Sequence, residues 1–595
     1  MLKYLSKVLY VLTGNRKNLA LLLFSFSLTS VLEALGIGMI APFLSLASNP
    51  ESIHKIALLA WLYAQLGLTS DNQLILLLGL AVICIFCIKA IVYFLSSSYI
   101  YKFSYDQKSL LVSRLLHAYL VVPYTFHLNR NTSTLIENII IETNHFTYLC
   151  LLPLLIASAN CIVVIILLLL LAKTDLLLLV MVLAILLPVF LWLARFGNKF
   201  KEWGKISSES QQGMIRTINH GLGGLKETRV IGCEAYFQSE MEQHANNYSR
   251  SAYLFNSYQL IPRVSIETIM VIFLIGFVSL SQIILNQDFQ DLIASISVFS
   301  VAAMRMIPSA SQLTQSMGNL KNSSYAVNQL YFDLKEIEKQ NLNFSSKLVD
   351  SDQKMHDESQ AMAFNQQVEL QEITYRYPNI SELAIEKISL TIKKGQSIGL
   401  IGKSGAGKTT LVDVILGLLQ PESGDIKVDG ISIYNNLRYW QNLVGYIPQS
   451  IFLIDDTIEH NIAFGVPDSL IDSERLEQAI KTAQLEELVD QLPEGIKTSV
   501  GERGVRLSGG QRQRIGIARA LYHEREILVL DEATSALDTE TERLVSEAIK
   551  SLAGTKTLII IAHRLSTVEH CDCIYLLEKG RVIRSGSYQE VILST

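Results

Sequence analysis

The chain of 595 residues is poor in charge and in cysteine. Only 18% of its residues are charged, whereas soluble globular proteins carry about 25%. Half of the residues are hydrophobic, which is too many for a disordered chain. The seven cysteines are an odd number and form no metal-ligand pattern with nearby histidines, so we interpret them as reduced apolar fillers. This composition excludes a disordered chain, a secreted disulfide scaffold and a simple cytosolic enzyme.

The few charges are unevenly distributed along the chain. Residues 1–320 hold 21 Lys and Arg and 16 Asp and Glu, whereas residues 321–595 hold 29 and 39. An apolar, mildly basic first half is therefore joined to an acidic, water-soluble second half.

The first half contains six hydrophobic runs that are each long enough to cross a bilayer core, which takes about 20 residues. They lie at roughly 19–48, 73–100, 146–172, 175–196, 257–285 and 289–315. We predict helices, because backbone groups in hydrocarbon must be satisfied within their own segment. Lys and Arg gather before the first run and after the second and fourth runs. This bias predicts that both termini are cytoplasmic.

Three cations, Lys89, Arg263 and Arg305, lie within different predicted spans. At about 1.5 Å per residue from the outer end of each span, they reach similar depths of roughly 24–33 Å. We therefore predict that they converge near the inner headgroup level and bind a lipid phosphate or pyrophosphate. Structural pairing remains an alternative, because Glu267 follows Arg263 by one helical turn.

A phosphate-binding motif opens the second half. The apolar run QSIGLIG (396–402) leads into GKSGAGKT (402–409) and a helical stretch, the strand–loop–helix context that this motif requires. The loop is predicted to cradle ATP with backbone N–H groups, Lys408 to reach the β- and γ-phosphates, and Thr409 to bind Mg²⁺. The predicted nucleotide-binding residues here are Gly402, Lys403, Ser404, Gly405, Ala406, Gly407, Lys408, Thr409 and Thr410.

Two further strands end in polar residues suited to ATP hydrolysis. ILVLDE (527–532) ends in Asp531, predicted to hold the Mg²⁺ shell, and Glu532, predicted to polarise the attacking water. His563 follows the apolar run TLIIIAH and is predicted to contact the γ-phosphate.

The string LSGGQRQR (507–514) makes the second half resemble the ATP-binding cassette transporter superfamily. The resemblance implies that Tyr377 stacks on adenine and that Gln449 serves catalysis and Mg²⁺. It also implies that two cassettes close head to tail, so that the signature of one chain caps the ATP of the other. The signature residues are Ser508, Gly509, Gly510 and Gln511.

The resemblance is to exporters, which implies an α-helical six-span transmembrane domain followed by an α/β P-loop nucleotide-binding domain. We expect a transmembrane domain at 1–320, a linker at 321–366 and the nucleotide-binding domain at 367–595. The nucleotide-binding motifs match the family pattern throughout, so a homodimer in a bacterial-type cytoplasmic membrane is favoured. No nucleic-acid partner is expected.

The whole chain looks most like bacterial flippases for lipid-linked oligosaccharides. The resemblance implies a polyprenyl-pyrophosphate oligosaccharide substrate, although one basic position of that group is Gln312 here. An exporter of another amphiphile, such as a lipid A-like glycolipid, a peptide or a drug, is the first alternative. An ATP-gated channel or regulator is the second.

Overall fold

The computed structural model describes most of the chain. The described residues are 2–12, 22, 24–29, 31–32, 36, 39, 43, 61, 63, 65, 70–128, 130–174, 176–284, 289–345, 363–378, 380–532, 539–562 and 564–593. Much of the first predicted span, as well as His563, lies outside them. The chain divides into two compact units, and each is described separately below.

The first unit comprises Met1–Val122 and Arg130–Lys339 and is helical. Its helices are α1 (Leu2–Val11), α4 (Asp71–Val121), α6 (Thr132–Glu137), η2 (Asn138–Glu142), α7 (Thr143–His145), η3 (Phe146–Leu151), α8 (Leu152–Thr174), α9 (Leu176–Gly223), α10 (Leu225–Ile231), α11 (Glu234–Ile284), α12 (Phe289–Asn322) and α13 (Ser324–Ser345). Two stretches in the described part, Asp71–Val121 and Thr132–Leu169, are long and apolar enough to cross a membrane.

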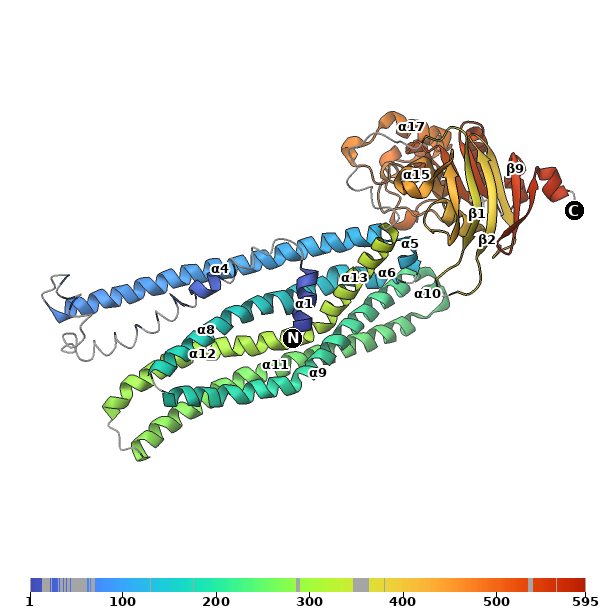
Figure 1. The fold of residues 1–595 in the computed structure, drawn as a ribbon. Coiled ribbons are helices and arrows are strands. Elements are labelled where there is room, and N and C mark those ends of the chain that lie inside the picture. Colours follow the sequence, from blue (N-terminus) through green and yellow to red (C-terminus); the bar gives the residue numbers. More distant parts are fainter. Residues whose placement is uncertain are drawn as a thin grey trace. The chain divides into compact units, whose positions relative to one another are not determined.

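The long helices α8, α9, α11 and α12 run side by side (Figure 1). Helix α11 has 51 residues, or about 75 Å at 1.5 Å per residue. Because a hydrocarbon core is about 30 Å thick, such a helix must extend well beyond it. Close packing of α9 on α12 depends on Gly204, where a Cβ atom would lie 2.1 Å from the carbonyl oxygen of Asn322.

Helix α13 corrects the predicted linker at 321–366. Residues Ser324–Ser345 are helical, and the first unit includes them as far as Lys339. The reason is an apolar stripe at helical spacing, in which Val327, Leu330, Leu334 and Ile337 are all buried. The membrane-type hydrophobicity ends near residue 320, but the packed helix continues.

One buried carboxylate connects three parts of the first unit. Asp333 on α13 is 2% exposed and accepts hydrogen bonds from Tyr119 (2.9 Å), Arg130 (2.8 Å) and Asn138 (2.6 Å). Tyr119 belongs to α4, Asn138 begins η2, and Arg130 lies between α4 and α6. A buried charge with this many donors fixes the ends of these elements relative to one another.

The second unit comprises Pro123–Asn129, which contains α5 (Tyr124–Leu128), and Gln340–Thr595. Its strands are β1 (Gln367–Tyr375), β2 (Ile385–Lys393), β3 (Ser397–Gly402), β4 (Ser423–Val428), β5 (Ile431–Ser432), β6 (Val444–Ile447), β7 (Ile527–Asp531), β8 (Thr557–Ile561), β9 (Cys573–Glu578) and β10 (Arg581–Gly586). Its longer helices are α14 (Lys408–Ile415), α15 (Leu437–Leu443), α17 (Ser473–Thr482), α19 (Gly509–Tyr522) and α20 (Thr539–Leu552).

These strands form two sheets (Figure 1). The four-stranded sheet, in the order β2-β1-β4-β5, is antiparallel. The six-stranded sheet has the order β10-β9-β3-β8-β7-β6, and all its pairs are parallel except β10 with β9. Strands β7 and β8 are buried at every residue, as expected for a parallel sheet covered on both faces.

Candidate functional site

The candidate site lies at one edge of the six-stranded sheet. Strands β3, β6, β7 and β8 run parallel, so their carboxyl ends lie at the same edge. The phosphate-binding loop follows β3, Gln449 follows β6, Asp531 ends β7, and Glu532 comes directly after it. Ligands of open α/β sheets bind at this edge. The sheet thus brings together residues that are up to 130 positions apart in the sequence.

The loop after β3 depends on glycine. Gly405 and Gly407 have φ angles of 80° and 97°, in the left-handed region, which costs other residues about 1–2 kcal/mol. A Cβ atom on Gly407 would also lie 2.7 Å from the carbonyl oxygen of Ala384. The Lys408 ammonium donates to the carbonyl oxygens of Gly402 at 2.8 Å and Lys403 at 3.2 Å. Two carbonyl oxygens of the loop therefore accept hydrogen bonds from the Lys408 ammonium and hold its side chain against the loop.

A cavity of about 850 Å³ adjoins this loop. Ser404 to Thr410, Glu532 and Tyr377 all line it. The hydroxyl groups of Tyr377 and Thr410 lie 3.1 Å apart, which connects the predicted adenine platform to the start of α14. The volume, the loop and the aromatic ring fit a nucleoside triphosphate.

At the end of β7, Glu532 and Gln449 are in direct contact. The Gln449 amide donates to Glu532 Oε2 at 2.7 Å, and the Tyr446 hydroxyl donates to Asp531 Oδ2 at 3.4 Å. Glu532 has a φ angle of 51°, which is uncommon for a non-glycine residue. Oxygen atoms from Thr409, Gln449 and Asp531 are the ligand type that Mg²⁺ prefers, so the described residues also fit the metal.

The electrostatics of the site match a phosphate cradle. Burial lowers the pKa of Lys408, while Glu532 and Asp531 act in the opposite direction. Burial, reinforced by the Asp531 carboxylate, raises the pKa of Asp413 on α14 to about 6. Asp413, which is half-buried, therefore keeps its proton more readily than an exposed carboxyl group.

The signature residues lie at the start of α19. Ser508 caps this helix and forms a capping box with Gln511: the Ser508 N–H donates to Gln511 Oε1 at 2.8 Å, and the Gln511 N–H donates to Ser508 Oγ at 3.2 Å. Ser508 and Gly509 are exposed. None of Ser508 to Gln511 is among the described residues that line the cavity. The phosphate loop therefore lines the cavity, whereas the signature residues of the same chain do not.

Sequence reasoning missed a turn that supports the phosphate loop. Lys579 and Gly580, between β9 and β10, line the cavity, and the Gly580 N–H donates to the Ala406 carbonyl oxygen at 3.0 Å. Glu386 on β2 lines it as well and pairs with Arg581. Lys579 and Gly580 both have positive φ angles, as in a two-residue hairpin turn, but nothing in the local sequence indicates that this turn lies against the loop after β3.

The predicted intramembrane cations are only partly described. Arg263 pairs with Glu267 at 3.0 Å on the same face of α11, which is the structural pairing that the sequence left open. The Lys89 ammonium lies 5.3 Å from the centroid of the Phe86 ring on α4. Arg305 belongs to α12, but its side chain lies outside the described residues, so convergence of the three cations remains a prediction.

Comparison with known proteins gives consistent matches. Residues 385–535 match the ABC transporter family. An ATP-dependent lipid A-core flippase from Ralstonia nicotianae is 31% identical over 69% of this chain and 68% of its own length. A flippase of the same name from a Shewanella species is 29% identical over 94% of this chain and 91% of its own length.

Among solved structures, a bacterial Atm1-family ABC exporter with ATP bound covers 97% of this chain, and this chain covers 96% of it. The TM-score is 0.71 at 21% identity, which shows a common fold over both units.

Proposed function

The chain belongs to the ABC transporter family as a half-transporter of the exporter type, and we propose that it uses ATP to move a phosphorylated, saccharide-bearing lipid across the cytoplasmic membrane. It is an ATP-hydrolysing membrane translocase. The single observation that supports the proposed cargo best is the likeness to lipid A-core flippases, which extends through the helical unit. We further propose that both termini are cytoplasmic, as the distribution of Lys and Arg predicts.

The proposed roles of the cassette residues follow from their positions. Backbone N–H groups of residues 403–409 and the Lys408 ammonium hold the phosphates, and Tyr377 supports the adenine. Mg²⁺, held by Thr409, Gln449 and Asp531, would neutralise the charge that develops on the phosphate oxygens. Glu532 accepts a proton from the attacking water, and the Gln449 amide orients the carboxylate at 2.7 Å. We propose that His563 contacts the γ-phosphate.

We propose that two copies of the chain form the working unit. Each copy supplies one phosphate loop and one signature helix, and the two lie in separate places on a single cassette. In a head-to-tail pair, the exposed N-terminus of α19 of one copy would face the phosphates bound by the other. Closure of the pair on ATP and its release after hydrolysis would then supply the conformational change that moves the lipid.

Two classes of lipid fit the proposed transport. The relatives are flippases for lipid A-core, and this glycolipid is the first candidate. A polyprenyl-pyrophosphate oligosaccharide is the second, because the spacing of Lys89, Arg263 and Arg305 predicts a phosphate site at the inner headgroup level. Both lipids combine an apolar anchor, phosphate and sugars.

The proposal is tested in proteoliposomes that contain the purified protein. Lipid A-core and a polyprenyl-pyrophosphate saccharide are supplied separately, and ATP-dependent movement to the opposite leaflet is measured. We expect transport of at least one of them and its loss in Arg305→Ala, with recovery in Arg305→Lys and unchanged basal ATPase activity. ATP hydrolysis without movement of either lipid would contradict the proposal.

A further inference from the structure

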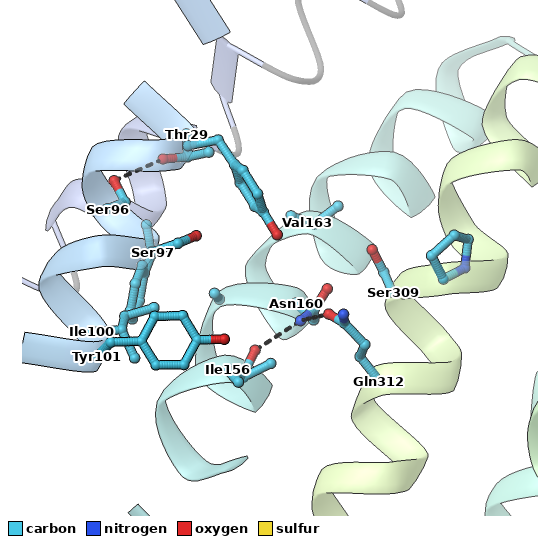
Figure 2. Close-up of a pocket in the computed structure, with 14 residues that line it drawn as sticks. Thr29, Ser96, Ser97, Ile100, Tyr101, Ile156, Asn160, Val163, Ser309 and Gln312 are labelled. Carbon is cyan, nitrogen blue, oxygen red and sulfur yellow. Dashed lines mark hydrogen bonds between the residues drawn. The ribbon is translucent and has the colours of Figure 1, made fainter. Parts of the chain in front are cut away.

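A second cavity lies within the helical unit and shares no lining residue with the cavity beside the phosphate loop. It has a volume of about 160 Å³ and is lined by residues of α4, α8 and α12 together with the helical stretch 24–29 (Figure 2). Binding pockets for drug-sized ligands span about 300–1,000 Å³. This cavity is therefore too small for a whole amphiphile, but it can hold one ring of a larger head group.

The lining is polar without being charged. Of the described residues that line the cavity, none is acidic or basic, whereas hydroxyl and amide groups are frequent. Asn160 on α8 donates to Gln312 Oε1 on α12 at 2.8 Å and to the carbonyl oxygen of Ile156 at 2.9 Å. Among the described residues, these bonds use the Asn160 amide hydrogens and Gln312 Oε1. The Asn160 Oδ1 acceptor and the Gln312 N–H donors can therefore hydrogen-bond a ligand in the cavity.

Ser309 is the strongest indication of a ligand. It is 1% exposed, lines the cavity, and its Oγ atom has no hydrogen-bond partner among the described residues. A buried hydroxyl without a partner destabilises a fold, and a bound ligand that hydrogen-bonds Ser309 would remove this destabilisation. Figure 2 shows Asn160 on α8, facing Ser309 and Gln312 on α12.

Aromatic residues complete the lining. Tyr93 and Tyr101 on α4, together with Phe26, also line the cavity. Neutral hydroxyls, carboxamides and aromatic faces match the surface of a sugar ring, which presents hydroxyl groups at its edge and C–H groups on its faces. A phosphate would instead require a cation or an array of backbone N–H groups.

We propose that this cavity is a subsite for one neutral sugar ring of the transported lipid, in which Ser309, Asn160 and Gln312 hydrogen-bond the ring hydroxyls. The inference rests on the proposed function and makes it more specific. Ser309 and Gln312 follow Arg305 on α12 by one and two helical turns, toward the predicted cytoplasmic end. A polyprenyl-pyrophosphate saccharide whose phosphate lies at the level of residue 305 would place its first sugar beyond the phosphate, on this side.

The test uses direct binding to the purified full-length protein in nanodiscs, measured by native mass spectrometry. Two probes carry equal charge: a polyprenyl pyrophosphate methyl ester and the same lipid with N-acetylglucosamine in place of methyl. The parent protein should bind the sugar probe at least about fivefold more tightly. Ser309→Ala should weaken the sugar probe about 3- to 10-fold, the effect of one hydrogen bond, and leave the methyl probe unchanged.

Ser158→Ala is the matched control. Ser158 lies on α8, and its hydroxyl donates to the Leu154 carbonyl oxygen at 2.8 Å rather than lining the cavity. Ser309→Ala removes no hydrogen bond of the described fold, so misfolding should not obscure the result; Gln312→Leu, checked by thermal unfolding, is the second variant. Equal affinity of the parent for both probes, or an equal loss on both in Ser309→Ala, overturns the subsite.

The proposed function can fail independently of the subsite. Selective sugar binding without ATP-dependent transport of either glycolipid would overturn the proposed function and leave the subsite standing. Transport without selective binding of the sugar probe would overturn the subsite and leave the proposed function standing.

Discussion

The Gln449 side chain donates a hydrogen bond to Glu532 Oε2 at 2.7 Å, which joins the loop after β6 to the end of β7. The two residues are 83 positions apart, and only the parallel pairing of β6 with β7 brings them together. The bond orients a carboxylate that lines the cavity next to the phosphate loop and can accept a proton.

Glu532→Gln should abolish turnover and preserve nucleotide binding. The amide cannot accept the proton of the attacking water, so ATPase activity should fall about 10²- to 10⁴-fold. Glu526→Gln is the control, because Glu526 precedes the same strand and pairs with Lys394 instead. ATPase activity in Glu532→Gln comparable to that of Glu526→Gln would remove Glu532 from the assigned role.

Gly407→Ala should impair ATP binding more than tenfold. Its Cβ atom would meet the Ala384 carbonyl oxygen at 2.7 Å, and the loop would have to open. Gly554→Ala isolates this effect, because Gly554 also has a positive φ angle, of 81°, but has open space around its Cβ position. We expect both variants to lose some thermal stability and only Gly407→Ala to lose affinity for ATP in a fluorescent-nucleotide titration.

Asp333→Ala should destabilise the helical unit strongly. It leaves the buried donors of Tyr119, Arg130 and Asn138 without this acceptor, a loss of about 3–5 kcal/mol by analogy with broken buried ion pairs. Glu336→Ala removes an exposed partner of Arg130, for which about 0–1 kcal/mol is expected. Thermal unfolding in detergent should therefore show a drop of several degrees for the first variant alone; equal midpoints would refute the anchoring role.

The His460–Asp456 pair predicts a small pH dependence of cassette stability. His460 Nδ1 donates a hydrogen bond to Asp456 Oδ1 at 2.8 Å, which raises the pKa of His460 and lowers the pKa of Asp456. Because the pKa of His460 is raised in the folded state, its protonation contributes its full stabilisation below about pH 6.5. This stabilisation is lost as the pH rises through the folded-state pKa. His460→Gln should make the unfolding midpoint less dependent on pH above pH 6.5. A slope identical to that of the parent would assign the pH dependence to other groups.

Much of the cassette was predictable because its signals are local. The strand before Gly402 and the helix after it are β3 and α14, and the strand that ends in Asp531 is β7. The glycine spacing and the apolar runs determine these elements without knowledge of the rest of the chain. The exporter fold was likewise predicted correctly.

The remaining features depend on contacts that a single sequence does not show. The linker prediction was wrong over Ser324–Ser345, because weaker helical periodicity follows the last hydrophobic run. The Lys579–Gly580 turn lies against the phosphate loop only through the pairing of β3 with β9. The cavity around Ser309 requires residues of α4, α8 and α12, none of which carries a motif.

In the proposed working unit, ATP is held between two copies of this chain, and cross-linking between the copies detects this arrangement. In a background without native cysteines and with Glu532→Gln, Ser404→Cys is introduced into one tagged copy and Ser508→Cys into a copy with a different tag. On addition of ATP, an oxidative cross-link should join the two tagged copies, and it should be absent without nucleotide. ATP binding at full occupancy with no such cross-link would show that the two copies do not share the nucleotide.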